Sequence, residues 1–129
     1  MPTLPWIAID PTPEAGEVVV MASRFRVRGY RHVLPFFLDA MRIHAQVRKA
    51  DGALGVSLVA HPLRREFATL SVWRDQDALN AMVRAEPHRT IMGRHRSAMA
   101  DSRFTFWNVP SSALPLDWDD AERRLAAAA

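Results

Sequence analysis

The chain has 129 residues, 49% hydrophobic and 24% charged, with no cysteine and a net charge of +3; this balance is typical of one globular domain and excludes disulfides, thiolate zinc sites and cysteine nucleophiles. The arginines are spread over every segment rather than clustered on one element, which argues against a nucleic-acid partner. With no apolar run of about 18 residues and no signal-peptide pattern at its start, the sequence predicts a cytoplasmic protein without a membrane partner.

The first segment, residues 1–16, is rich in proline. Its four prolines exclude a helix or a central strand, so we expect an extended N-terminal arm. Trp6, Ile7 and Ile9 make the arm apolar enough to dock on the parent domain or on a partner subunit.

Glu17–Val27 alternates in hydrophobicity with a period of two and is predicted as a long strand. Both of its faces are apolar at the start. Towards its end, one face carries Arg24, Arg26 and Arg28 in succession. Two interpretations stay open: a solvated strand end paired with carboxylates, or a cradle for an anionic or carbonyl-bearing ligand. In the second interpretation, Arg24 and Arg26 are ligand-binding residues.

A helix is predicted for Leu34–Ala50, with proline in its first turn and an apolar stripe at helical spacing. Gly52 ends the helix because glycine takes positive φ without strain. Two strands follow, Ala53–Ala60 and Glu66–Trp73, which a short turn joins into an antiparallel hairpin.

The stretch after the hairpin predicts a jointed helix. Asp75 is a candidate N-cap, and the helix is expected to run from there to about Ala85. Pro87 ends this helix and opens a second one, predicted for His88–Ala100. The last strand is Ser102–Val109, which a proline stops.

The predicted order of strand, helix, strand, strand, helix and strand is that of a ferredoxin-like α+β fold, βαββαβ. We expect one domain over residues 17–110, with a four-stranded antiparallel sheet. Residues 111–129 add a loop and a short helix that begins at Asp117. Two helices cover only one face of such a sheet, and the other face is also apolar. We therefore expect a homodimer packed sheet to sheet.

Two sets of residues carry a resemblance to a known superfamily: Leu70–Asp75 with Ala78, Leu79, Pro87 and His88, and Phe106–Pro110 with Pro115 and Ala121–Leu125. The chain resembles the dimeric α/β-barrel superfamily of antibiotic biosynthesis monooxygenase-like proteins, and more narrowly a largely uncharacterised bacterial branch near the spheroidene monooxygenase-like proteins. The resemblance implies a barrel shared by two subunits, with a ligand pocket between each sheet and its helices.

Members of this superfamily include cofactor-free oxygenases, haem-degrading and haem-binding enzymes, and proteins without known activity, so membership does not fix function. The haem-degrading members carry an Asn, a Trp and a His in the pocket. Trp73 and His88 match two of these residues, but the strand 18–27 has no Asn. That departure counts against haem degradation by the same route.

Two residues are the candidate catalytic pair. His88, just past the helix break, is a candidate general base or axial haem ligand, or else a cap of the helix joint. Trp73 is either a pocket residue or plain core.

His95 is a second candidate ligand-binding residue, two turns beyond His88 along the same helix. This spacing is too wide for one metal ion, so no metal site is predicted. Trp107 and Asn108, from the second motif, are assigned to the ligand pocket.

The predicted function is binding of a mostly apolar or aromatic small molecule in a homodimeric α+β barrel, with cofactor-independent oxygenation as the reaction. Two alternatives stay open: a haem-binding protein or oxygenase that uses His88 or His95, and a non-catalytic ligand-binding module. Arg24, Trp73 and His88 are expected to meet at one cavity if their side chains leave the sheet on the same face.

Overall fold

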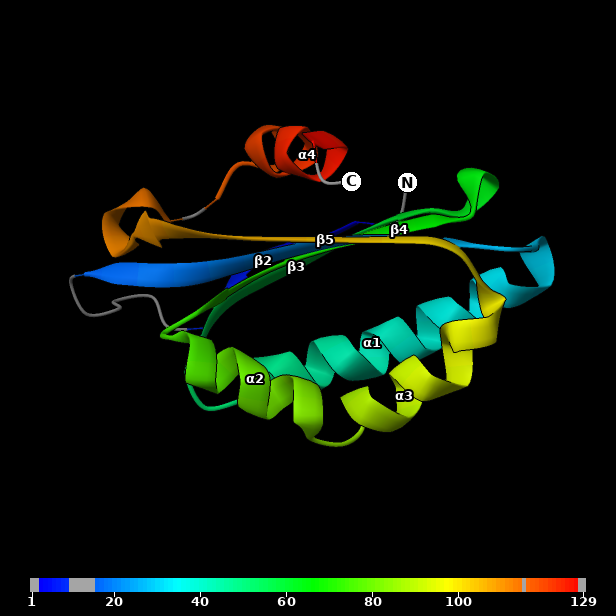
Figure 1. Ribbon diagram of the computed structural model, residues 1–129, viewed down its shortest axis with the longest axis horizontal. Coiled ribbons are helices and arrows are strands. Elements are labelled where there is room, and N and C mark those ends of the chain that lie inside the picture. Colours follow the sequence, from blue (N-terminus) through cyan, green and yellow to red (C-terminus); the bar gives the residue numbers. More distant parts are fainter. Residues whose placement is uncertain (1–2, 10–15, 115, 128–129) are drawn as a thin grey trace.

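The computed structural model describes residues 3–9, 16–114 and 116–127. A five-stranded antiparallel sheet lies between α1–α3 on one side and α4 on the other (Figure 1). The strands are β1 (Thr3–Ala8), β2 (Glu17–Val27), β3 (Ala53–His61), β4 (Glu66–Trp73) and β5 (Met99–Pro110), in the spatial order β1-β3-β4-β2-β5. The helices are α1 (Val33–Lys49), α2 (Gln76–Arg84), α3 (His88–His95) and α4 (Trp118–Ala127).

Most of the predicted elements are present, so the α+β class and the antiparallel sheet are confirmed. β2 and β4 have the predicted bounds, and α1 begins and ends one residue earlier than expected. The Asp75 carboxylate caps α2 by accepting a hydrogen bond from the Ala78 N–H at 2.8 Å. The second part of the jointed helix is shorter than predicted, because α3 ends at His95 and β5 already begins at Met99.

The prediction of a four-stranded sheet is wrong, because β1 adds a fifth strand at the edge beside β3. Pro5 lies where the β1–β3 register shifts, a position that tolerates the missing N–H of proline. The indole of Trp6 lies over Gly55, where a Cβ atom would collide with the ring. Part of the predicted arm thus belongs to the sheet, whereas its prolines at 2, 11 and 13 lie outside the described residues.

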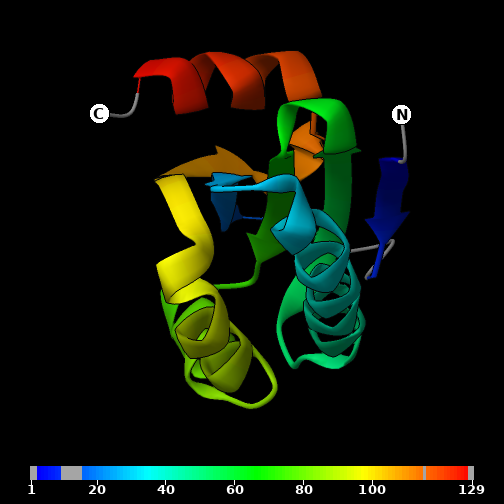
Figure 2. The same ribbon diagram turned by 90° about the vertical axis from the view of Figure 1, so that its right-hand side faces the viewer.

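The two faces of the sheet have different covers (Figures 1 and 2). On one face, α1–α3 bury the cluster around Trp73, Leu79, Met82 and Val47, and a second cluster of phenylalanines. On the other face, Ala121 and Leu125 of α4 pack on side chains of the central strands, which are Val18, Val20, Ala22, Leu70 and Val72. None of the helices in the described ranges is long and apolar enough to cross a membrane.

The cover by α4 corrects the reason for expecting a homodimer. Leu70 and Val72 are fully buried within a single chain. The helix forms at this place because Asp117 accepts a hydrogen bond from the Asp119 N–H at 2.9 Å, and because its apolar side chains recur at helical spacing. Because α4 already buries the side chains on this second face, the face does not need a partner subunit to be shielded from solvent.

Candidate functional site

A mostly apolar cavity of about 70 Å³ lies between the sheet and α1–α3. Its apolar walls include Met21 and Phe25 of β2, Ile43 and Val47 of α1, Met82 of α2, Ile91 and Met92 of α3, and Phe104 of β5. The polar side chains among its lining residues include His44, His88, Ser23, Thr69 and Ser71. Within the described part of the chain, no lysine or arginine lines the cavity. A few polar groups converging in an apolar cavity are the usual composition of a small-molecule site.

His44, on the cavity side of α1, is 7% exposed. Its Nε2 atom is buried and has no hydrogen-bond partner among the described residues. Burial lowers the pKa of His44, and the charge of Arg48 lowers it further, so the ring is neutral at pH 7. Buried polar atoms are almost always hydrogen-bonded, so the unpaired Nε2 atom of His44 is an unusual feature of the cavity.

His88 enters the cavity from the first turn of α3. Its Nδ1 atom lies 3.2 Å from the Val83 carbonyl oxygen, which accepts hydrogen bonds only. Nδ1 therefore carries the proton, and Nε2 is the basic nitrogen. Burial lowers the pKa of His88, and the bond to Val83 offsets only part of that effect. The residue is thus a neutral imidazole with the properties of a general base.

Hydroxyl groups line the sheet side of the cavity. Ser23 of β2 and Thr69 of β4 are paired across the strands and share a short hydrogen bond. The Ser71 oxygen accepts a hydrogen bond from the Trp73 indole N–H at 2.9 Å. The Ser71 hydroxyl keeps its own hydrogen to donate to another group.

Trp73 lies on the same side of the sheet as His88, as the predicted site required. It is fully buried and packs with Leu79 and Met82, but it does not line the cavity. Its indole fixes Ser71 instead. Trp73 is therefore a support of the cavity wall rather than a residue that meets a ligand.

Arg24 points to the opposite face of the sheet, where its guanidinium lies 2.5 Å from the Glu122 carboxylate of α4. Arg26 lies on the same face and is exposed. Side chains alternate between the faces of a strand, so residues 24 and 26 of β2 face α4 while residues 23 and 25 face the cavity. The expectation that Arg24 meets Trp73 and His88 is wrong, and the arginines are salt-bridged or solvated.

Trp107 and Asn108 also lie outside the cavity lining. Trp107 packs against the core under α4, with the Arg124 guanidinium 4.5 Å from its ring centroid. Asn108 is exposed on the edge strand β5. Of the seven predicted site residues, His88 is the one that lines the cavity.

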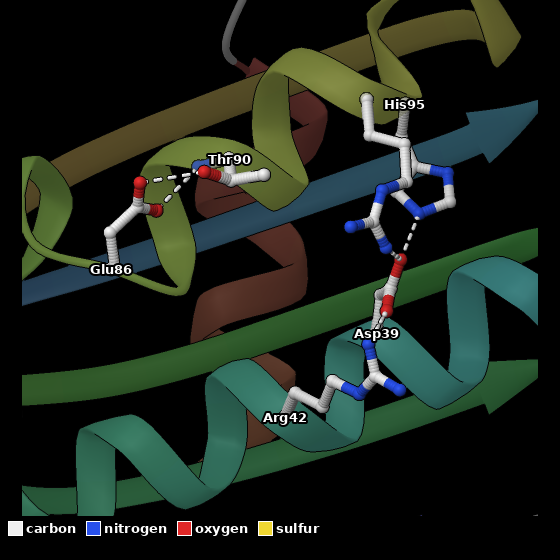
Figure 3. Close-up of polar contacts among 6 residues, drawn as sticks. Asp39, Arg42, Glu86, Thr90 and His95 are labelled. Carbon is white, nitrogen blue, oxygen red and sulfur yellow. Dashed lines mark hydrogen bonds and ion pairs between the residues drawn. The ribbon is translucent and has the colours of Figure 1, made fainter.

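His95 is buried beside Asp39 at the contact between α1 and α3 (Figure 3). Its Nε2 atom lies 2.7 Å from the Asp39 carboxylate, which also binds Arg94 at 2.9 Å and Arg42 at 3.2 Å. Burial alone would raise the pKa of Asp39, but the His95 hydrogen bond and the Arg94 charge together lower it. The carboxylate is therefore ionised, and the His95 Nε2–H donates to it.

The sequence matches the model of a family described as a domain of unknown function, DUF3291, over residues 39–129. The chain belongs to the DUF3291 family. No curated protein matches the sequence. The match covers the larger part of α1 and every later element up to α4. The strands β1 and β2 and the start of α1 lie before it.

Solved structures extend the comparison at the level of the fold. A conserved protein from Methanosarcina mazei Go1 aligns with a TM-score of 0.62 at 12% identity, over 70% of this chain and 90% of its own. SnoaB, a cofactor-independent oxygenase from Streptomyces nogalater, aligns at 0.58 and 18% identity, over 78% of this chain and 100% of its own. An antibiotic biosynthesis monooxygenase aligns at 0.59 and 14% identity, over 69% and 95%. The resemblance to antibiotic biosynthesis monooxygenase-like proteins is confirmed for the fold of this DUF3291 protein.

At its present volume, the cavity of the DUF3291 chain does not fit haem. The Nε2 atom of His95 is engaged by Asp39, and the cavity volume of about 70 Å³ is far below the roughly 300–1,000 Å³ of sites for larger ligands. Among the described residues, no three His, Asp or Glu side chains gather closely enough to hold a metal ion.

Sequence reasoning missed His44, the hydroxyls and Asp39. The stripe of α1 contains a sign of the first, because His44 follows Ala40 by four residues and precedes Val47 by three, which puts an imidazole on the buried side. Ser23, Thr69 and Ser71 likewise interrupt apolar strand faces that become buried. In each case, a polar residue occupies a position where the hydrophobic pattern predicts an apolar one.

Proposed function

We propose that this DUF3291 protein binds a neutral, mostly apolar ring compound that carries a hydroxyl group, in the cavity between the sheet and α1–α3. The observation that carries the proposal is the unpartnered Nε2 atom of His44 in an apolar cavity. A ligand hydroxyl satisfies this nitrogen in either imidazole tautomer, because a hydroxyl both donates and accepts. The absence of lysine and arginine from the lining favours a neutral ligand over an anion.

The remaining polar groups support a reaction as well as binding. In this proposal the Nε2 atom of His88 accepts a proton from the ligand, and the Ser71 hydroxyl donates to a carbonyl oxygen on which negative charge develops. We propose cofactor-independent oxygenation, in which the deprotonated substrate itself supplies the electrons to dioxygen. One oxygen atom enters the substrate and the other leaves as water. SnoaB, which shares the fold, is described as a cofactor-independent oxygenase.

The ligand needs more room than the cavity offers at rest. A cavity of about 70 Å³ is far smaller than the roughly 300–1,000 Å³ of typical small-molecule sites. Phe104 is both a lining residue and 47% exposed, so it lies at the mouth, and Met92 adds a flexible side chain to the wall. We infer that a ring enters past Phe104 as these side chains move.

Binding is tested with phenol and benzene, which share a ring and differ by the hydroxyl. Titrations followed by NMR of the Ile91 and Met92 methyl groups should show that phenol binds about tenfold or more tightly than benzene, because benzene leaves the His44 nitrogen unpaired. His44→Leu should remove that preference, and the matched control His32→Leu, outside the cavity, should keep it. Equal affinities for the two ligands in the wild type would refute the proposed ligand class.

Turnover is tested with a hydroxylated anthrone and an oxygen electrode. The wild type should consume oxygen with formation of the quinone, and His88→Ala should lower the rate by about 10²–10⁴-fold, the usual contribution of a general base. Phenol binding without oxygen uptake by the wild type would favour the non-catalytic ligand-binding module.

We also propose that the protein is a homodimer, on a different basis from the sheet-to-sheet packing expected from sequence. β5 is an edge strand of the sheet, and its Phe106 is 55% exposed. A sheet edge with an exposed aromatic side chain favours association with a second chain. Sedimentation should give a dimer at micromolar concentration, and Phe106→Arg should shift it towards monomer. A monomeric wild type would refute the assembly.

A further inference from the structure

α3 is attached to α1 at both of its ends by polar contacts. The His95 side chain, at the end of α3, binds Asp39, and the His88 backbone N–H, at its start, binds the Gln46 side chain. Asp39 and Gln46 are seven residues apart, and so are His88 and His95. Seven residues are about two helical turns, so side chains with this spacing lie on the same face of each helix and can contact each other at two points along an antiparallel pair. The two attachment points therefore define the register of α3 on α1.

The polar contacts matter because α3 has little else to hold it. It is eight residues long, and only Ile91 and His95 are buried. A helix of this length is unstable by itself, so its position depends on tertiary contacts. The Glu86 carboxylate, just before α3, caps the first turn of the helix by accepting from the Thr90 N–H at 2.9 Å and from the Thr90 hydroxyl at 2.6 Å (Figure 3). This cap is internal to the segment and does not fix it to α1.

Gln46 is the residue that joins the three helices. Its Nε2 donates to the Met82 carbonyl of α2 at 3.1 Å, and its Oε1 accepts from the His88 N–H of α3 at 2.9 Å. The His88 N–H, at the start of α3, is one of the groups that lack a partner within their own helix. The Met82 carbonyl, near the end of α2, accepts from Gln46 in addition to the Ala85 N–H at 3.1 Å. The amide fits only one way round, with its nitrogen towards α2 and its oxygen towards α3.

His88 is held from two sides by this arrangement. Gln46 holds its backbone, and the Val83 carbonyl, one residue after the carbonyl that Gln46 binds, holds its Nδ1 atom. The orientation of the ring in the cavity wall depends on both groups keeping their positions. We propose that Gln46 is a positioning residue that sets the orientation and the tautomer of His88. This proposal rests on the proposed function in one respect only, which is the role of His88 as a general base.

The experiment reads the His88 ring directly by long-range ¹H–¹⁵N NMR, without any ligand. The wild type should show the Nδ1–H tautomer. In Gln46→Ala that signature should be lost to exchange between tautomers, and the titration midpoint of His88 should rise towards the ordinary value of 6.5, because the ring becomes more hydrated. Gln76→Ala is the matched control, since that glutamine bonds only to Asn80 on the surface of α2.

Amide hydrogen exchange gives a second measurement that separates local loosening of α3 from a uniform loss of stability. In Gln46→Ala the amides of His88 and Ile91 should exchange faster, whereas those near His95, still held by Asp39, should not. Gln46→Asn draws the amide back by one methylene, so that it no longer spans both helices, and should give the same pattern if the alanine variant does not fold. An unchanged His88 tautomer and unchanged amide exchange in either folded variant would overturn the proposal.

Failure here is distinguishable from failure of the proposed function. In the oxygen assay, Gln46→Ala should lower kcat by about tenfold or more through His88, while the Kd for phenol, which depends on His44, should change less than about threefold. If the wild type neither binds phenol nor consumes oxygen, the proposed function fails, yet the tautomer measurement still decides the role of Gln46. A loss of phenol binding in Gln46→Ala equal to that in His44→Leu would also count against selective positioning of His88.

Discussion

The two faces of the sheet differ in what their buried side chains do. Leu70 and Ser71 are neighbours in β4, but Leu70 packs under α4 and Ser71 faces the cavity under α1–α3. The α4 face buries one contiguous apolar cluster, and its unpaired polar atoms among the described residues include the Trp107 indole nitrogen. The opposite face also buries apolar clusters, but it places imidazoles, hydroxyls and the unpaired His44 nitrogen around a cavity. Burial of apolar area stabilises a fold, and unpaired polar atoms destabilise it. The α4 face thus serves mainly stability, and the cavity face gives up some stability for a site.

The largest effect is expected on the α4 face. Leu70→Ala should lower the free energy of unfolding by about 2–5 kcal/mol, because it opens a space in a fully buried cluster. Urea unfolding measures this, and Leu63→Ala is the control, since Leu63 is 86% exposed and should change stability by less than about 0.5 kcal/mol. A loss below about 1 kcal/mol for Leu70→Ala would mean that α4 does not seal this face.

On the cavity face, Ser71→Ala should cost about 1–3 kcal/mol, because it leaves the Trp73 indole N–H buried without an acceptor. In the Trp73→Phe background, the same change should cost much less, since the donor is gone. A double-mutant cycle of unfolding free energies measures the coupling. If the two changes are additive, the bond between Trp73 and Ser71 does not support the cavity wall.

Much of this contrast is predictable from local patterns. The alternation in β2 and β4 assigns Leu70 and Trp73 to opposite faces, and the Asp75 cap places the start of α2. β1 was missed because a proline argues against a strand unless it lies at an edge or an irregular register. The cover by α4 was missed because its buried stripe consists of little more than Ala121 and Leu125 in an alanine-rich tail.

The candidate site was harder to predict than the fold. The position of His88 follows from a proline and a helix break, which are local features. The role of Gln46 depends on three helices meeting, and the pairing of Asp39 with His95 joins residues 56 positions apart. Such contacts have no period in the sequence. The seven-residue spacing is visible only once α1 and α3 are known to be neighbours.

The pH dependence of stability should reveal the buried imidazoles. Burial lowers the pKa of His44 and His88 in the folded state, so only the unfolded chain takes up their protons as the pH falls below the ordinary value of 6.5. Their contribution is complete above that pH and is lost below it, down to the folded pKa values. The Tm should fall between pH 7 and pH 5, and His44→Leu should reduce the slope. An equal slope in the variant would mean that His44 is hydrated.

The smallest effect is expected for Arg24, which sequence reasoning placed in the ligand site. Its ion pair with Glu122 lies on the α4 face, with 27% and 44% of the two side chains exposed. Partly exposed pairs of this kind contribute about 0–1 kcal/mol and are weakened by salt. Arg24→Ala should therefore change the free energy of unfolding by less than about 1 kcal/mol, and by less still at 1 M salt.

The same variant should leave phenol binding unchanged, because the sheet separates Arg24 from the cavity. Titration of Arg24→Ala beside His44→Leu measures the two sides of the sheet with one ligand. If Arg24→Ala weakened phenol binding as much as His44→Leu, the ligand would contact the α4 face, and the division between a face for stability and a face for binding would be wrong. A loss confined to His44→Leu places the ligand under α1–α3, where the unpaired imidazole nitrogen is.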